Sequence, residues 1–166
     1  MTKLLRPSFS RLDIYRAFAD GTRAMFALEE AVTKSTLDPL LLELLRTRVS
    51  QLNGCAFCLD MHQRAARKKG ERQQRLDLIA SWRDAPGYDA RERAALALAE
   101  SLTLVAGRGL PEEVWREAAS AFEPQELAAL VFAVAATNSW NRLSMASGAT
   151  PPLYNEESYS EDGGVP

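Results

Sequence analysis

The sequence from Glu43 to Gly70, ELLRTRVSQLNGCAFCLDMHQRAARKKG, contains both cysteines of the chain and its only histidine. These residues are Cys55, Cys58 and His62, and Glu43 stands twelve residues before the first cysteine. On a helix that turns by about 100° per residue, the two thiols and the imidazole fall within roughly 100° of one another. Two thiols and a base on one face are the groups that dithiol chemistry requires.

Turn signals divide this part of the chain into two helices. Asp38 is a suitable N-cap and Pro39 suits the first helical position, so a helix is predicted to begin there. The Asn-Gly pair at 53–54 interrupts that helix, which places Cys55 near the start of the next one. The second helix is predicted to continue to Lys69 and to stop at the glycine that follows.

Helical periodicity continues through the rest of the chain. Further helices are expected at residues 12–32 with a break near Gly21, and at 71–83, 89–105, 111–122 and 124–146. The last of these is so apolar between Leu127 and Ala136 that it is expected to be buried on most sides. No segment alternates at period two. The sequence therefore predicts an all-α bundle of about seven helices without a sheet.

The length of 166 residues suits one domain spanning residues 1–166, because the chain shows no internal repeat. Residues 1–11 are expected to form a loose N-terminal arm. Residues 147–166 contain four acids and no base, which favours a flexible acidic C-terminal arm.

Charge and hydropathy exclude several classes of partner. The net charge of −2 favours neither nucleic acid nor an anionic membrane surface. No apolar run reaches the roughly 18 residues that a membrane span needs, and the first 15 residues lack the apolar core of a signal peptide. We therefore expect a cytoplasmic protein, where a lone C-x-x-C is more often a redox or metal site than a structural disulfide.

From the residues alone, Cys55 and Cys58 have three interpretations: redox chemistry, metal binding, or packing as small buried side chains. His62 follows Cys58 by about one helical turn, so the two side chains can meet directly or through a water. It is either a polar side chain with an ordinary partner or the base that serves the thiols. Redox function is favoured.

Two sets of charged residues are ambiguous. Glu43 interrupts five leucines, and with Arg46, Thr47 and Ser50 it forms either a solvated stripe or part of a site. A basic run is expected to be a solvated face, with the docking of an acidic partner protein as the alternative. Its members are Arg64, Arg67, Lys68, Lys69, Arg72 and Arg75.

Together these residues resemble a known family. The pattern E-x11-C-x2-C-x3-H is similar to the active-site signature of the AhpD-like branch of the carboxymuconolactone decarboxylase superfamily. It is formed here by Glu43, Cys55, Cys58 and His62. The flanking segment VSQLNGCAFCLDMH, Trp82 with the segment RERAALALAE at 91–100, and NSWNRL at 138–143 are also similar to this branch. The similarity extends from about residue 24 to 146.

The resemblance implies an all-helical fold that assembles into trimers or hexamers, and a thiol peroxidase that needs no cofactor or metal. It implies that one cysteine attacks the peroxide, that the other closes a disulfide, and that a Glu43–water–His62 relay moves protons. Proximity to His62 and the family favour Cys58 as the attacking thiol and Cys55 as the resolving one, whereas the position at a helix start favours Cys55. A thiol reductant, such as a lipoyl-bearing or thioredoxin-like protein, is the implied partner.

The chain departs from the best-studied members of this branch in two ways: Phe57 stands where they carry a second histidine, and about a hundred residues follow the motif, which lies late in their chains. Phe57 makes the pocket more apolar and leaves the relay to Glu43 and His62. The rival functions are a cofactor-free decarboxylase or isomerase, and a regulatory module that senses thiols or metals. A closed zinc site would need Cys55, Cys58, His62 and Glu43 as its ligands.

The second half of the chain is expected to complete the site and to mediate assembly into a homo-oligomer. The residues that suggest this are Asn138, Trp140, Asn141 and Arg142. If Arg142 is buried it needs a carboxylate, for which Glu92 and Glu100 are the first candidates. Replacing Glu43 or His62 by Gln removes no volume, so the sequence predicts a small change in thermal midpoint.

Overall fold

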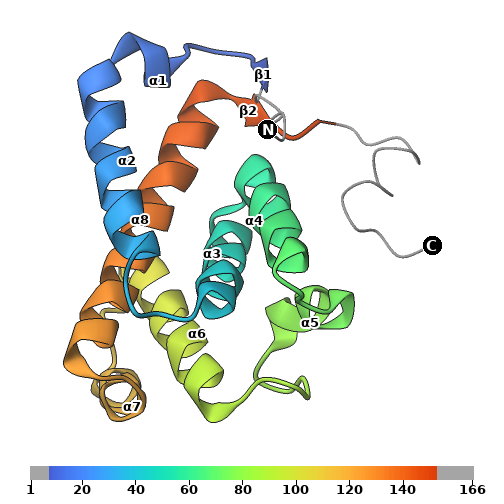
Figure 1. Ribbon diagram of the computed structural model, residues 1–166, viewed down its shortest axis with the longest axis vertical. Helices are drawn as coiled ribbons and strands as arrows, with labels where there is room; N and C mark the ends of the chain where they lie inside the picture. The colour runs from blue at the N-terminus through green and yellow to red at the C-terminus, as the bar shows by residue number, and fades with distance from the viewer. Residues whose placement is uncertain (1–7, 153–166) are drawn as a thin grey trace.

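The computed structural model of the chain describes residues 8–152 and consists almost entirely of helices (Figure 1). The α-helices are α1 (Ile14–Ala17), α2 (Ala19–Thr33), α3 (Pro39–Asn53), α4 (Ala56–Lys68), α5 (Gln73–Leu78), α6 (Ala90–Thr103), α7 (Glu112–Ala121) and α8 (Pro124–Ser147). A 3-10 turn, Ile79–Ser81, extends α5. The predicted all-α class is confirmed, with eight α-helices in the described part where about seven were expected.

One short extended pair joins the two ends of the described chain. Strand β1 (Ser8–Phe9) pairs antiparallel with β2 (Ala149–Thr150), and the backbone N–H of Arg11 donates to the carbonyl of Ser147 at 3.2 Å. No strand was predicted, because two residues are too few to show alternation. Residues 1–7 and 153–166, which make up most of the two predicted arms, lie outside the described residues.

The caps of α3 and α4 follow the local sequence signals. The Oδ1 atom of Asp38 accepts hydrogen bonds from the backbone N–H groups of Leu40 and Leu41 at 2.9 and 2.8 Å. Gly54 ends α3 in the left-handed region, at φ +70°, where a residue with a side chain would be strained. Cys55 then serves as the N-cap of α4. This tight turn holds the C-x-x-C segment against the end of α3.

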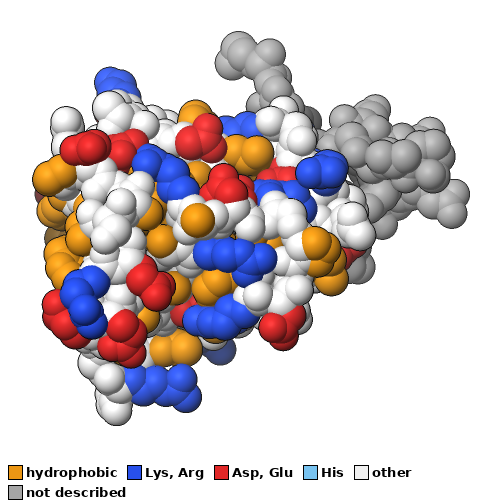
Figure 2. Space-filling view, turned by 90° about the horizontal axis from the view of Figure 1, so that it is seen from below, with side chains coloured by type: hydrophobic (Ala, Val, Ile, Leu, Met, Phe, Trp, Pro, Cys, Tyr) orange, Lys and Arg blue, Asp and Glu red, His pale blue; other side chains and the backbone are white. Residues whose placement is uncertain are grey.

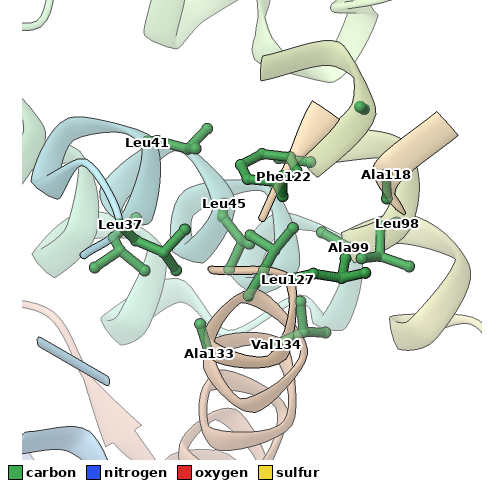
Figure 3. Close-up of a cluster of buried hydrophobic side chains, with 14 of the residues drawn as sticks. Leu37, Leu41, Leu45, Leu98, Ala99, Ala118, Phe122, Leu127, Ala133 and Val134 are labelled. Atoms are coloured by element: carbon green, nitrogen blue, oxygen red, sulfur yellow. The ribbon is translucent and has the colours of Figure 1, made fainter. Parts of the chain in front are cut away.

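Helix α3 is the central element and packs against α4, α6 and α8. Its apolar side chains belong to two buried clusters. One cluster lies between α3, α6, α7 and α8 (Figure 3) and includes Leu41, Leu45, Leu98, Phe122, Leu127 and Val134. The other lies towards α5 and includes Leu44, Leu76, Ile79, Trp82 and Leu96. Leu76, Ile79 and Trp82 are the inward-facing residues of the segment predicted to be helical at 71–83.

The structure refines two details of the helical prediction. The break predicted near Gly21 falls three residues earlier, at Phe18, which separates α1 from α2. Between Leu127 and Ala136, helix α8 is buried or half-buried at most positions, as predicted, but one face points outward and leaves the Phe132 side chain 57% exposed. Composition shows that a helix is apolar, but it does not show how many of its faces have a neighbour.

Arg142 does not pair with either acid that was considered for it. It is exposed, and its guanidinium donates to the carbonyl and to Oδ1 of Asn138 at 2.8 and 2.9 Å. Glu92 pairs with Arg75, while Glu100 accepts from Arg48 Nε at 2.7 Å and has two further donors. Because Arg142 reaches solvent, it needs no buried carboxylate.

The face seen from below in Figure 2 carries acidic and basic side chains among apolar ones, and neither sign of charge dominates it. Within residues 8–152, no helix combines the length and the apolarity that crossing a membrane requires.

Candidate active site

The two cysteines lie at the start of α4 and are joined by a disulfide, with their Cα atoms 5.3 Å apart. Each is only 2% exposed. The backbone N–H of Cys58 donates to the Cys55 sulfur at 3.3 Å, because Cys55 is the N-cap of the helix. This contact and the positive end of the helix both favour negative charge on the Cys55 sulfur.

A cavity of about 810 Å³ reaches the C-x-x-C segment from one side. Its wall includes Cys58, Phe57 and His62 from α4, whereas Cys55 does not contribute to it. Of the two cysteines, Cys58 is therefore the one that a molecule in the cavity can contact. The prediction that Phe57 makes the pocket more apolar agrees with the position of this ring in the wall.

The imidazole of His62 is held by Glu43 across the groove between α3 and α4. His62 Nδ1 lies 3.0 Å from Glu43 Oε2, and the side chains are 13% and 6% exposed. The contact is direct, without the intervening water of the predicted relay. Since Nδ1 is engaged by the carboxylate, Nε2 is the ring nitrogen left for proton transfer.

Glu43 has two further donors besides His62. Its Oε1 accepts from Lys69 Nζ at 3.0 Å and from Arg46 Nη1 at 3.3 Å. Burial raises the pKa of Glu43, but the hydrogen bond and charge of His62, with Arg46 and Lys69, outweigh that effect and lower the pKa to about 2. The carboxylate is therefore ionised at neutral pH.

The alternative of a solvated stripe on α3 is wrong. Glu43 and Arg46 are 5% and 6% exposed, and Thr47 and Ser50 are fully buried. Arg46 also pairs with Glu29 of α2, and both side chains reach the cavity wall. A buried charge is costly unless it is paired, so these paired charges belong to the interior of the protein and not to a solvated surface.

The basic run from 64 to 75 is only in part a solvated face. Lys69 folds back onto Glu43, and Arg75 is paired with two carboxylates, including Glu71 at 2.9 Å. The sequence did not assign Lys69 to the site, because the contact joins the end of α4 to the first turns of α3. No regular spacing marks such a contact.

Residues of α8 frame the site from the other side. Asn53 Nδ2 donates to Oδ1 of Asn138 and of Asn141 at 3.0 and 2.9 Å, and Asn141 Nδ2 donates to Ser50 Oγ at 3.1 Å. These bonds tie α8 to the end of α3, directly before the cysteines. Trp140 lies in the cavity wall.

A closed metal site is not assembled by these residues. The sulfurs of Cys55 and Cys58 are bonded to each other, and Glu43 is already engaged by three donors. Among the residues that the structure describes, no group of three or more His, Cys, Asp and Glu side chains is placed to hold a metal ion.

Comparison with known proteins adds to this geometry. The sequence profile of the Carboxymuconolactone decarboxylase family matches residues 19–101. The chain is 36% identical over 138 residues to the uncharacterized protein YdfG of Bacillus subtilis (strain 168). The aligned region covers 83% of this chain and 94% of that protein.

Two solved structures show the same arrangement of helices. The structure of ATU0492 from Agrobacterium tumefaciens, a protein of unknown function described as a putative antioxidant defence protein AhpD, superposes with a TM-score of 0.83 and 32% identity. That match covers 87% of this chain and 99% of the other. An uncharacterized peroxidase-related protein from Ralstonia eutropha JMP134, with an alkylhydroperoxidase AhpD core, gives a TM-score of 0.75 at 21% identity. The match covers 92% of this chain and 79% of the Ralstonia chain, and at this identity it supports the fold alone.

Proposed function

Because the chain belongs to the carboxymuconolactone decarboxylase family, in its AhpD-like branch, we propose that it is a thiol peroxidase that reduces organic hydroperoxides. The observation that carries the proposal is the position of Cys58 in the wall of an apolar cavity, beside a histidine that a buried carboxylate orients. The bond between Cys55 and Cys58 is the oxidised half of the cycle that such an enzyme needs.

In the first step the thiolate of Cys58 attacks the outer oxygen of the hydroperoxide. A sulfur–oxygen bond forms, the oxygen–oxygen bond breaks, and the alkoxide leaves. His62 takes the thiol proton before attack and returns it to the alkoxide, which yields the alcohol and a sulfenic acid on Cys58. His62 follows Cys58 by one turn of α4, which is contact spacing on a helix.

In the second step the thiolate of Cys55 attacks the Cys58 sulfur. The new sulfur–sulfur bond displaces hydroxide, which takes a proton and leaves as water. The hydrogen bond from the Cys58 N–H to the Cys55 sulfur supports the role of Cys55 as the resolving thiol, since it stabilises a thiolate that the cavity does not reach. A dithiol reductant, such as a lipoyl-bearing or thioredoxin-like protein, then reopens the disulfide by exchange and supplies the two electrons.

Glu43 acts in this scheme as a positioning residue. With a pKa of about 2 it holds no proton to donate at neutral pH, so it fixes the orientation of His62 and stabilises the imidazolium that forms when His62 takes the thiol proton. The proton moves between Cys58, His62 and the alkoxide.

The test is a stopped-flow reaction of the reduced protein with an alkyl hydroperoxide and with hydrogen peroxide, followed by counting of free thiols. We expect both thiols to disappear and one alcohol to form per disulfide. Cys58→Ser abolishes the reaction, whereas Cys55→Ser reacts once and stops with an oxidised Cys58. Reduced protein that is inert towards every peroxide, or a reaction that survives Cys58→Ser, contradicts the proposal.

A further inference from the structure

The wall of the cavity beside Cys58 includes five aromatic rings from Phe, Tyr and Trp side chains. Six apolar side chains from β1, α1, α2, α4 and α8 line it: Phe9, Tyr15, Phe26, Phe57, Met61 and Trp140. The Trp140 ring lies between two others, with centroid distances of 5.1 Å to Phe26 and 6.1 Å to Tyr15. A further contact of 5.6 Å joins Tyr15 to Phe9. Rings at these distances in tilted arrangements offer both faces and edges to a guest ring.

The volume of the cavity far exceeds what the peroxide group itself requires. At about 810 Å³ it falls within the range of roughly 300–1,000 Å³ that is usual for sites of drug-sized ligands. A small peroxide is comparable with one or two waters, each with a share of about 30 Å³ in the liquid. Hydrogen peroxide would therefore leave most of the apolar wall without contact.

The charges on the wall are balanced. Arg46 is paired with Glu29 and with Glu43, so its charge is already compensated. Asp13 and Arg16, of opposite charge, also stand in the wall, three residues apart on the chain. Because the charges of the wall sum to zero, the wall as a whole exerts no net attraction that would offset the cost of moving an ionised ligand out of water.

We propose that this cavity selects neutral hydroperoxides that carry an aromatic ring, with the ring against Phe26 and Trp140 and the peroxide group at Cys58. The proposal rests on the proposed function for the chemistry at Cys58, whereas the class of ligand follows from the cavity itself. The reaction is the same two-electron reduction. The oxygen–oxygen bond breaks, the aromatic alcohol leaves, and Cys55 and Cys58 supply both electrons as they form the disulfide.

Cumene hydroperoxide and tert-butyl hydroperoxide provide a matched pair, since both are tertiary and neutral and differ by a phenyl group in place of a methyl group. We expect kcat/KM to be about tenfold or more higher for cumene hydroperoxide, from burial and ring contacts of the phenyl group. Trp140→Leu should lower this ratio to near one. Trp115→Leu is the control: it replaces an indole of α7 that lies outside the cavity wall, and it should leave the ratio unchanged.

A binding measurement on the disulfide form separates the ligand class from the chemistry. In a ¹H–¹⁵N spectrum the three tryptophans give indole signals, and the Trp140 signal is identified by its loss in Trp140→Leu. We expect 2-phenyl-2-propanol, the alcohol product, to shift the Trp140 signal at concentrations where tert-butanol and benzoate do not, with Trp115 unaffected.

The outcomes of the two experiments are distinct. Binding of the aromatic alcohol without turnover of any hydroperoxide supports the ligand class and overturns peroxide reduction. Equal kcat/KM values for the two hydroperoxides, with no shift of the Trp140 signal, overturn the aromatic selection and leave peroxide reduction standing. Benzoate binding as tightly as the alcohol overturns the selection of neutral ligands.

Discussion

Replacement of Glu43 by Gln tests the central electrostatic feature of the site. The amide keeps the volume of the carboxylate, but it removes the negative charge that accepts from His62, Arg46 and Lys69. We expect the rate of peroxide reduction at pH 7 to fall about 10²-fold, the usual scale for lost acid–base assistance. The imidazole loses both its fixed orientation and the charge that stabilises its protonated form.

The same substitution is expected to change stability. The ordinary pKa of 4.5 and the folded value of about 2 differ by an amount that corresponds to about 3 kcal/mol of unfolding free energy. Because the folded pKa is the lower one, the stabilisation is complete above about pH 5 and is lost as pH falls through about 2. For a chain of this length, 3 kcal/mol corresponds to about 6–12 °C in thermal midpoint. The small change predicted from volume alone is thus revised.

Urea unfolding of wild-type protein and Glu43→Gln between pH 2 and 8 measures this difference. The two curves should be about 3 kcal/mol apart at neutral pH and should converge near pH 2. Glu100→Gln is a matched control, since Glu100 is another buried carboxylate with three donors. Burial raises the pKa of Glu100, but the contacts with Trp82, Arg83 and Arg48 outweigh burial and lower it. It should lose stability without loss of peroxide rate. A Glu43→Gln protein with unchanged rate would refute the positioning role, and parallel stability curves would refute the ionised carboxylate.

Three further predictions follow from the same contacts. One equivalent of hydroperoxide should consume both thiols and give a Cys55–Cys58 disulfide in mass spectrometry, whereas sulfinic acid on either cysteine would contradict the two-thiol cycle. Lys69→Met should slow the reaction by less than about tenfold, because Lys69 is 41% exposed and Glu43 keeps its contacts with Arg46 and His62. We also propose a trimer or hexamer in which the outward face of α8 packs against a second copy. Light scattering should then exceed the 18.3 kDa of one chain, and Phe132→Asp should reduce the mass towards it.

Local sequence signals predicted the bounds of the two helices that carry the site residues. Asp38 marks the start of α3, and the Asn-Gly pair at 53–54 marks its end, because capping and left-handed turns depend on adjacent residues. Cys58 and His62 are one turn apart on α4, so their common face followed from helical spacing. The partnership of Glu43 with His62 joins two helices, and it was inferred from the family resemblance.

The rest of the site depends on contacts between helices, which no spacing encodes. Arg46 was assigned to the same ambiguous stripe as Glu43, although it bridges Glu43 and Glu29 in the interior. Lys69 was included in a solvated run, although it is the third donor to the carboxylate. Charged side chains are mostly exposed in proteins, so a sequence pattern assigns them to the surface unless a packing partner is known. Buried ion pairs are therefore underestimated from sequence.

The hydrogen bonds among Asn53, Asn138, Asn141 and Ser50 involve no ionisable group. Neutral amide and hydroxyl contacts do not titrate, and dissolved salt screens them little compared with exposed ion pairs. This joint, the hydrogen-bonded contact of Asn53, Asn138, Asn141 and Ser50, aligns α8 with the C-x-x-C turn. It is therefore insensitive to acidity and ionic strength, the two solution variables that act on Glu43 and its donors. A buffer series can alter the proton chemistry of this site while the joint that supports it keeps its geometry.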